Sequence, residues 1–273
     1  MTWEMPGPAW LFCPADRPER FDKAATAADV VILDLEDGVA PADKPAARRA
    51  LLEQPLDPER TVIRVNAAGT DEHTLDLKTL VDTGYRRIML PKCEGVEQIA
   101  SMTECEVIAL IESPHGALTV GNALHVDNAI GVMWGAEDLV AAMGGTSSRH
   151  ADGSYRDVAR HVRSTTLLAA KAHGKFALDS VYLDIRDTDG LRAESDDAVA
   201  VGFEAKVAIH PSQIPVIRAA YRPSPDEVSW ARRLLAEAPN NRGVFVFEGR
   251  MVDGPLIRHA EHILHRAGPD REV

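Results

Sequence analysis

Short apolar runs recur eight times along the chain, and each is followed by a turn and a longer, more polar stretch. The runs are AWLFCP (9–14), VVILDLED (30–37), TVIRVN (61–66), RRIMLPK (86–92), EVIALIES (106–113), AIGVMWGAED (129–138), FALDSVYLD (176–184) and KVAIHP (206–211). Several are continuously apolar rather than alternating, which is typical of parallel strands covered on both faces. The pattern therefore predicts eight parallel strands.

The segments between these runs carry the periodicity of helices. Examples are KPAARRALLEQ (44–54), PHGALTVGNAL (114–124) and residues 155–174, where Gly174 is expected to end the helix. Eight β-then-α units in one chain predict a (β/α)8 TIM barrel, with an open doubly wound sheet as the alternative. In a barrel the carboxyl ends of the strands meet on one face, and that face should carry the chemistry.

A tail follows the eighth run. We expect residues 1–221 to form the barrel and residues 222–273 to form a C-terminal helical extension. The extension contains two amphipathic stretches, 225–238 and 256–268, on either side of GVFVFEGRMVDGP (243–255). Because an amphipathic helix needs an apolar surface to cover, we expect this extension to pack on the barrel or on a neighbouring subunit.

Composition excludes several other classes of protein. The chain has 273 residues, 45% of them apolar, and a formal net charge of −12, which argues against a nucleic-acid surface. No apolar run is long enough for a membrane span, and the first residues lack the pattern of a secretory signal, so the expected location is the cytoplasm. Cys13, Cys93 and Cys105 lack zinc-type spacing and are expected to be buried, reduced thiols.

Charged side chains follow the predicted strands. These strand-end residues are Asp34, Glu36, Asp37, Arg64, Asn66, Lys92, Glu112, Glu137 and Asp138. Glu112 and Asp138 end adjacent strands, and two carboxylates at one edge suit a Mg²⁺ ion completed by water and substrate oxygens. The alternative is that each acid caps the helix that follows it.

Arg64 lies inside an apolar strand run, where an apolar residue is the usual choice. A guanidinium there can bind a substrate carboxylate through two hydrogen bonds. The alternative is a buried ion pair with Glu36 or Asp37, and the two interpretations are compatible before substrate binds. Asp37 itself has three possible roles: it binds substrate or metal through water, positions Arg64, or shapes the turn at Gly38.

Several segments together resemble one known family. LFCPADRPERFDKA, VVILDLEDGV, TVIRVNAAGT, IMLPK, IALIESPHGA, WGAEDL, FALDSVYLD, KVAIHPSQI and GRMVDGPLIRHA are similar to the citrate lyase beta-subunit-like branch of the HpcH/HpaI aldolase family. Malyl-CoA and citramalyl-CoA lyases are similar too. The resemblance spans nearly the whole chain, and the combination of segments is more specific than any one of them.

The resemblance implies a TIM barrel, a trimeric or larger homo-oligomer, and Mg²⁺-dependent, reversible cleavage of a 3-hydroxyacyl thioester of coenzyme A. It assigns metal binding to Glu112 and Asp138, substrate contact to Glu112 as well, and substrate carboxylate and oxyanion binding to Arg64. Net synthase or thioesterase output from the same enolate chemistry, and a non-catalytic thioester-binding subunit of a citrate lyase complex, are the alternatives. The acyl group, its stereochemistry and the direction of the reaction stay open.

The resemblance also implies roles for residues outside the strand ends. Arg17 and Lys23 match positions that contact the phosphates of coenzyme A, although both are expected to be solvated charges on their own account. Asp253 matches an acid–base carboxylate that comes from a neighbouring subunit. Without the resemblance, Asp253 is more simply interpreted as the residue that starts a helix.

Overall fold

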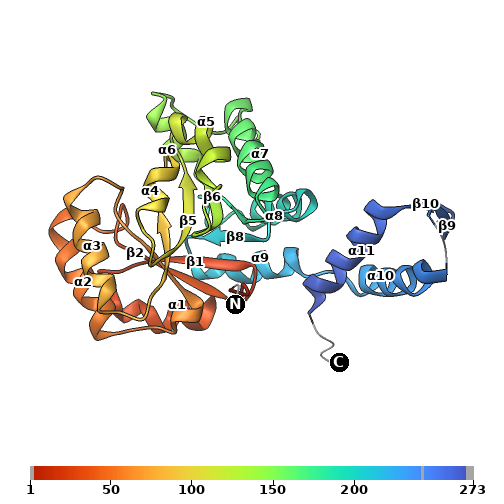
Figure 1. The fold of residues 1–273 in the computed structure, drawn as a ribbon, viewed down its shortest axis with the longest axis horizontal. Helices are drawn as coiled ribbons and strands as arrows, with labels where there is room; N and C mark the ends of the chain where they lie inside the picture. The colour runs from red at the N-terminus through yellow and green to blue at the C-terminus, as the bar shows by residue number, and fades with distance from the viewer. Residues whose placement is uncertain (1–2, 241–242, 269–273) are drawn as a thin grey trace. The chain divides into compact units, whose positions relative to one another are not determined.

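Eight parallel strands close into a barrel in the order in which they occur along the chain (Figure 1). The computed structural model describes residues 3–240 and 243–268. Its barrel strands are β1 (Ala9–Pro14), β2 (Val30–Asp34), β3 (Thr61–Arg64), β4 (Arg87–Leu90), β5 (Glu106–Ile111), β6 (Ala129–Trp134), β7 (Phe176–Asp179) and β8 (Ala205–Ala208). Each predicted run contains one strand, so the TIM barrel is confirmed and the open-sheet alternative is wrong.

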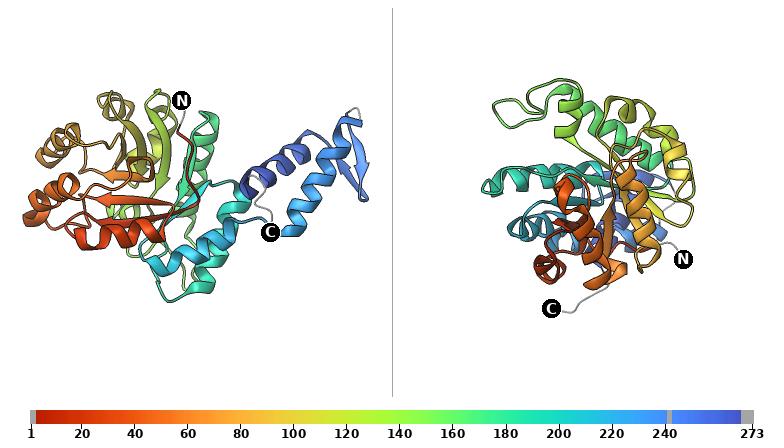
Figure 2. Two further views of the ribbon diagram at one scale, coloured as in Figure 1. Left: turned by 90° about the horizontal axis from the view of Figure 1, so that it is seen from below. Right: turned by 90° about the vertical axis from the view of Figure 1, so that its left-hand side faces the viewer.

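Helices connect the strands and lie around the barrel (Figures 1 and 2). They are α1 (Phe21–Ala27), α2 (Lys44–Glu53), α3 (Asp71–Val81), α4 (Val96–Ala100), α5 (Pro114–Ala123), α6 (Ala136–Ala142), α7 (Asp157–Ala172), α8 (Thr188–Val201) and α9 (Ile214–Tyr221). Gly174, two residues beyond α7, has a φ of +64°, as its predicted role at the helix end requires. In the described part of the chain, no helix is long and apolar enough to cross a membrane.

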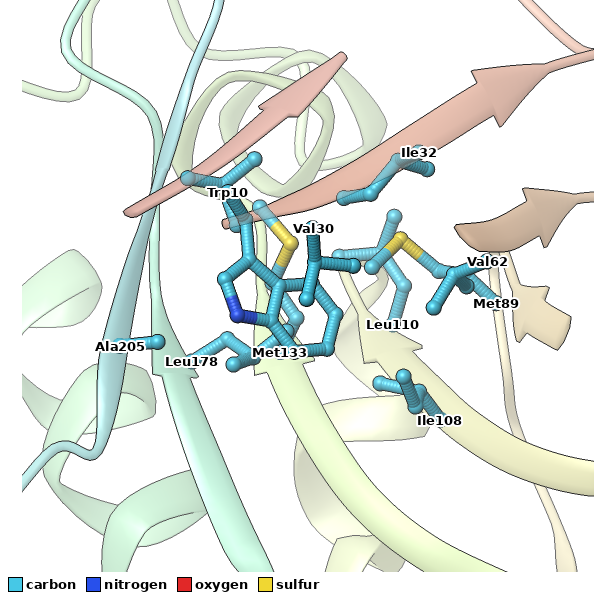
Figure 3. Close-up of a cluster of buried hydrophobic side chains, with 11 residues drawn as sticks. Trp10, Val30, Ile32, Val62, Met89, Ile108, Leu110, Met133, Leu178 and Ala205 are labelled. Atoms are coloured by element: carbon cyan, nitrogen blue, oxygen red, sulfur yellow. The ribbon is translucent and has the colours of Figure 1, made fainter. Parts of the chain in front are cut away.

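The barrel interior is filled by apolar side chains from all eight strands (Figure 3). This buried core consists of Trp10, Val30, Ile32, Val62, Met89, Ile108, Leu110, Met133, Leu178, Ala205 and Val207. Successive residues of a strand point to opposite faces, so the neighbours of these core residues point outward, toward the helices. A barrel filled in this way is a solid core, and its chemistry is confined to the strand ends.

The three cysteines are free thiols. Cys13 and Cys93 are buried, and burial raises the pKa of each thiol to about 11, so both are protonated at neutral pH. Cys105 is only half-buried, so the expectation of full burial is wrong for this residue.

The second unit comprises Arg218–Val273, so the first unit ends at Ile217 rather than at residue 221. It contains α10 (Pro225–Glu237), an antiparallel hairpin of β9 (Phe245–Phe247) and β10 (Arg250–Val252), and α11 (Gly254–Ala267). The small core of this unit is formed by Ala231, Leu234, Val252, Ala260 and Ile263. The two predicted amphipathic stretches are thus helices that bury their apolar faces against each other.

Candidate active site at the carboxyl ends of the strands

Arg64 and Asp34 form a two-point ion pair at the carboxyl ends of β3 and β2. The Arg64 Nε–H donates to Asp34 Oδ1 at 2.7 Å, and Nη2 donates to Oδ2 at 2.5 Å. Glu36 Oε2 lies 3.2 Å from Nη1 of the same guanidinium. Burial alone would lower the pKa of Arg64, but Asp34 and Glu36 outweigh it and raise that pKa, so the cation is permanent.

Asp34 has a role that the sequence analysis did not assign. The ion-pair interpretation of Arg64 named Glu36 or Asp37 as its partner; the structure confirms Glu36 and adds Asp34 in place of Asp37. Asp34 also accepts hydrogen bonds from the backbone N–H groups of Glu36 and Gly38, both at 2.9 Å. It therefore shapes the turn at Gly38, which was one of the three possible roles of Asp37. Strand register would have revealed the pair, because Asp34 and Arg64 are partners across β2 and β3.

Lys92 links this pair to the next strand ends. Its Nζ donates to Glu36 Oε1 at 2.5 Å and to the exposed Asp37 at 3.1 Å. Its backbone has a φ of +50°, which is unusual for a residue with a side chain. That conformation directs the Lys92 N–H to Glu112 Oε1 at 2.9 Å. The strained backbone thus supplies a hydrogen bond to the predicted metal ligand.

Glu112 directly follows β5, and Asp138 lies in the first turn of α6, just beyond β6. Glu112 is buried, with 3% of its surface exposed, whereas Asp138 is exposed. Burial first, and then the charges of Asp138 and Glu36, raise the pKa of Glu112 to about 8. The fold therefore brings the two predicted ligands close enough for the charge of Asp138 to disfavour ionisation of Glu112.

The strand ends carry more negative than positive charge. Five carboxylates gather here, those of Asp34, Glu36, Asp37, Glu112 and Asp138, and within the described residues Arg64 and Lys92 form ion pairs with Asp34, Glu36 and Asp37. When these seven groups are all ionised their net charge is −3, and the Lys44 ammonium at the Glu36 carbonyl offsets one of these charges. Moreover, the buried Glu36 Oε2 accepts no hydrogen bond from the described residues. An oxygen-rich site with unbalanced negative charge fits a hard divalent cation such as Mg²⁺.

The described residues contain no cluster of three or more His, Cys, Asp or Glu side chains arranged to hold a metal. A site on Glu112 and Asp138 would therefore have only two protein ligands. That number is usual for Mg²⁺, which keeps several waters and binds substrate oxygens.

A buried polar network supports the β2 and β3 ends from outside the barrel. The Lys44 ammonium donates to the backbone carbonyls of Leu35 and Glu36 at 2.7 and 2.9 Å and to Asn66 Oδ1 at 2.6 Å. Asp76, fully buried, accepts hydrogen bonds from the Asn66 backbone and side-chain amides at 2.8 and 2.7 Å. Because these groups are paired, the turn that carries Glu36 is held rigidly.

The other predicted residues lie on other segments of the chain. Arg17 and Lys23 are exposed, one just after β1 and the other in α1, and Arg17 lies 3.5 Å from Asp16. Asp253 lies in the second unit at the start of α11, half-buried. It occupies the N-cap position and therefore starts the helix, as its simpler interpretation predicted, although its side chain accepts no capping hydrogen bond within the described residues.

Comparison with known proteins agrees with this geometry. The family model described as HpcH/HpaI aldolase/citrate lyase matches residues 9–211. A citrate lyase subunit beta-like protein of Mycobacterium tuberculosis is 60% identical, with 98% of each chain covered. A crystal structure of CitE from M. tuberculosis, in complex with magnesium, acetoacetate and coenzyme A, superposes with a TM-score of 0.92 and 61% identity, covering 96% of this chain and 98% of that one.

More distant relatives carry two different activities in their names. Human mitochondrial citramalyl-CoA lyase is 31% identical, covering 98% of this chain and 87% of its own length. A (3S)-malyl-CoA thioesterase of Cereibacter sphaeroides is 32% identical, covering 94% of this chain and 93% of its own length. The family match spans the barrel, and these relatives span nearly the whole chain. The chain therefore belongs to the HpcH/HpaI aldolase/citrate lyase family.

Proposed function

We propose that the protein is a Mg²⁺-dependent lyase that reversibly cleaves the carbon–carbon bond of a 3-hydroxyacyl-CoA. The substrate class is that of citramalyl-, malyl- or hydroxymethylglutaryl-CoA, and the products are a keto acid and a shorter acyl-CoA. The observation that carries the proposal is the buried Glu112 beside Asp138 and Arg64. The magnesium and coenzyme A named with the solved CitE structure, and the citramalyl-CoA lyase relative, support it.

Glu112 and Asp138 are the groups that would hold the cation. Bound there, Mg²⁺ would supply Lewis-acid chemistry toward the carboxylate and hydroxyl of the substrate. Arg64, held in place by Asp34, keeps N–H groups available to a substrate carboxylate and to negative charge that develops during cleavage. Asp37, exposed beside Lys92, lies at the rim as a further substrate contact.

The bond changes balance without a covalent enzyme intermediate. The substrate hydroxyl gives its proton to solvent water, the bond between C2 and C3 of the acyl chain breaks, and a carbonyl forms on the departing keto acid. The electron pair passes to the thioester as an enolate, whose carbon then takes a proton from Asp253. In the condensation direction, Asp253 removes that proton instead.

Arg17 and Lys23 are proposed to bind the phosphates of coenzyme A. Both are exposed near the carboxyl end of β1, the end of the barrel that carries the candidate site. Local positive charge of this kind is needed because the chain as a whole has a formal net charge of −12.

Thioester hydrolysis after condensation is the second candidate function, and the malyl-CoA thioesterase relative favours it. Both functions use the same enolate chemistry, but they release different products. A third interpretation is a non-catalytic subunit that holds a thioester within a citrate lyase complex. The combination of Arg64, Glu112 and Asp138 argues against a purely structural role.

A product assay separates these functions. The protein is incubated with a panel of 3-hydroxyacyl-CoA compounds, with Mg²⁺ or with EDTA, and the products are identified by mass. We expect a keto acid plus a shorter acyl-CoA, formed only with Mg²⁺ and reduced at least about 100-fold in Glu112→Gln, in which the metal site is disrupted. Free coenzyme A as the main product would support hydrolysis, and binding without any product would contradict the proposed enzyme.

The raised pKa of Glu112 makes a second prediction, for metal-free protein. The pKa of Glu112 is higher in the folded protein than the ordinary value of 4.5. The protonated carboxyl therefore contributes its full stability below pH 4.5, and this contribution is lost as the pH rises through about 8 and the buried group ionises. In EDTA, the free energy of unfolding of wild type should therefore fall by on the order of 1–3 kcal/mol between these pH values, relative to that of Glu112→Gln. Thermal unfolding of the two proteins at a series of pH values measures this difference.

Added Mg²⁺ should reverse that loss, because the metal replaces the proton on Glu112. The increase in melting temperature on adding Mg²⁺ should become larger from pH 6 to pH 9 in wild type, and it should be small in Glu112→Gln. Glu106→Gln, at the opposite end of the same strand, is the matched control and should respond like wild type. An equal gain in Glu112→Gln would show that the metal binds elsewhere.

The proposed role of Asp253 in a neighbouring subunit of a homotrimer is tested by complementation. Asp253→Asn and Arg64→Ala should each lower kcat at least about 100-fold, because each removes one catalytic group. Mixed oligomers, formed by co-expression with two different tags, should regain activity, since some sites combine an intact Arg64 with a partner's intact Asp253. If no activity returns in purified mixed oligomers, both residues belong to one chain's site.

A further inference from the structure

Trp134 and Asp179 form a buried hydrogen bond on the outer side of the barrel wall. The indole Nε1 of Trp134 donates to Asp179 Oδ1 at 2.8 Å, and both residues have 0% of their surface exposed. Their chain neighbours Met133 and Leu178 belong to the barrel core (Figure 3). Because side chains alternate along a strand, Trp134 and Asp179 point outward, away from that core.

Asp179 is held firmly by two cations. Lys206 Nζ lies 3.0 Å from Oδ2, and Arg163 Nε lies 2.9 Å from Oδ1. Lys206 is itself fully buried and also reaches Glu194 at 2.7 Å. A buried anion with this many partners has little freedom to move. Asp179 is therefore a fixed acceptor for the Trp134 indole.

The residue after Trp134 contacts the proposed metal ligand. A Cβ on Gly135 would lie 2.9 Å from Glu112 Oε2 and 3.0 Å from the Glu112 Cβ, so a larger residue at position 135 would displace the Glu112 side chain. The Gly135 N–H donates to the Ile111 carbonyl at 2.9 Å. Gly135 is also the N-cap of α6, whose first turn carries Asp138. The Trp134–Gly135 pair thus lies between Asp179 and both proposed ligands.

The segment that follows α6 packs on the same indole. The centres of the Tyr155 and Trp134 rings lie 5.0 Å apart in an edge-to-face arrangement, and the Arg149 guanidinium lies 3.7 Å from the centre of the Tyr155 ring. Arg149 in turn pairs with Glu194 at 2.7 Å, which returns to the Lys206 network. Trp134 is consequently held on more than one side.

We propose that Trp134 and Asp179 are positioning residues for the metal site: they fix the turn from β6 to α6 and thereby set the separation of Glu112 and Asp138. This inference rests on the proposed metal-dependent function and extends it to side chains on the outer face of the barrel strands β6 and β7. Mutation of residues that orient metal ligands without binding the metal commonly lowers metal affinity by about 10- to 100-fold.

Mn²⁺ binding to the purified full-length protein, measured by titration calorimetry and by the loss of the free Mn²⁺ resonance signal, tests the inference without substrate. Trp134→Phe removes the indole donor and keeps an aromatic ring. Trp10→Phe is the matched control, because Trp10 is equally buried and its Nε1 donates to the Gly7 carbonyl at 3.1 Å. Glu112→Gln tests the metal site itself.

We expect the Mn²⁺ dissociation constant of Trp134→Phe to rise about tenfold, while that of Trp10→Phe stays within about twofold of wild type. Equal binding by Trp134→Phe and wild type would overturn the inference, as would equal weakening by both tryptophan variants. If Glu112→Gln binds like wild type, the proposed metal site fails and the inference fails with it.

Should Trp134→Phe not fold, as judged by circular dichroism, Tyr155→Leu takes its place. This variant leaves the Trp134–Asp179 hydrogen bond intact and removes the ring that packs on the indole. A rise of about threefold in the Mn²⁺ dissociation constant is expected, because the indole is then less confined. An unchanged constant in folded Tyr155→Leu would count against the positioning role.

Discussion

Repulsion between carboxylates that the fold holds close together is the constraint on which the candidate site depends. Burial first, and then the nearby charges of Asp138 and Glu36, raise the pKa of Glu112 to about 8, so the metal-free site retains a proton at neutral pH. A buried carboxylate beside other carboxylates costs free energy unless a counter-charge joins them. A divalent cation would supply that counter-charge, and the same cation would activate a 3-hydroxyacyl thioester.

The rest of the barrel keeps this repulsion from disrupting the fold. Charged groups in and around the site are paired: Arg64 with Asp34, Lys44 with the Asn66 side chain and two carbonyls, and Lys206 with Asp179. Such pairs add little net stability, but they fix geometry because removing one partner leaves a buried charge unpaired. Rigid supports on both sides of the site keep the uncompensated carboxylates in place.

Periodicity and strand-end chemistry predict much of this protein from the sequence. The continuous apolar runs identify all eight strands, and order along the chain places Glu112 and Asp138 at adjacent strand ends. What the sequence does not reveal is which charges pair. Asp34 stands among the predicted strand-end residues, but Glu36 and Asp37 follow it in the same acidic segment, and only strand register identifies Asp34 as the partner of Arg64.

Other features depend on contacts between distant parts of the chain. Lys206 and Asp179 lie inside apolar runs 27 positions apart, and nothing local indicates that they meet. The φ of +50° at Lys92 is likewise set by the surrounding strands and not by a glycine or asparagine signal. The C-terminal unit is predictable as two amphipathic helices, whereas the role of Asp253 comes from family resemblance and awaits its own test.

The central claim is that Glu112 and Asp138 share one divalent cation. A crystal of the protein soaked in Mn²⁺ at pH 8, with data collected near the manganese absorption edge, tests it directly. The account predicts an anomalous peak within about 2.5 Å of a carboxylate oxygen of each residue. A strong peak elsewhere, with none between these two carboxylates, would contradict it.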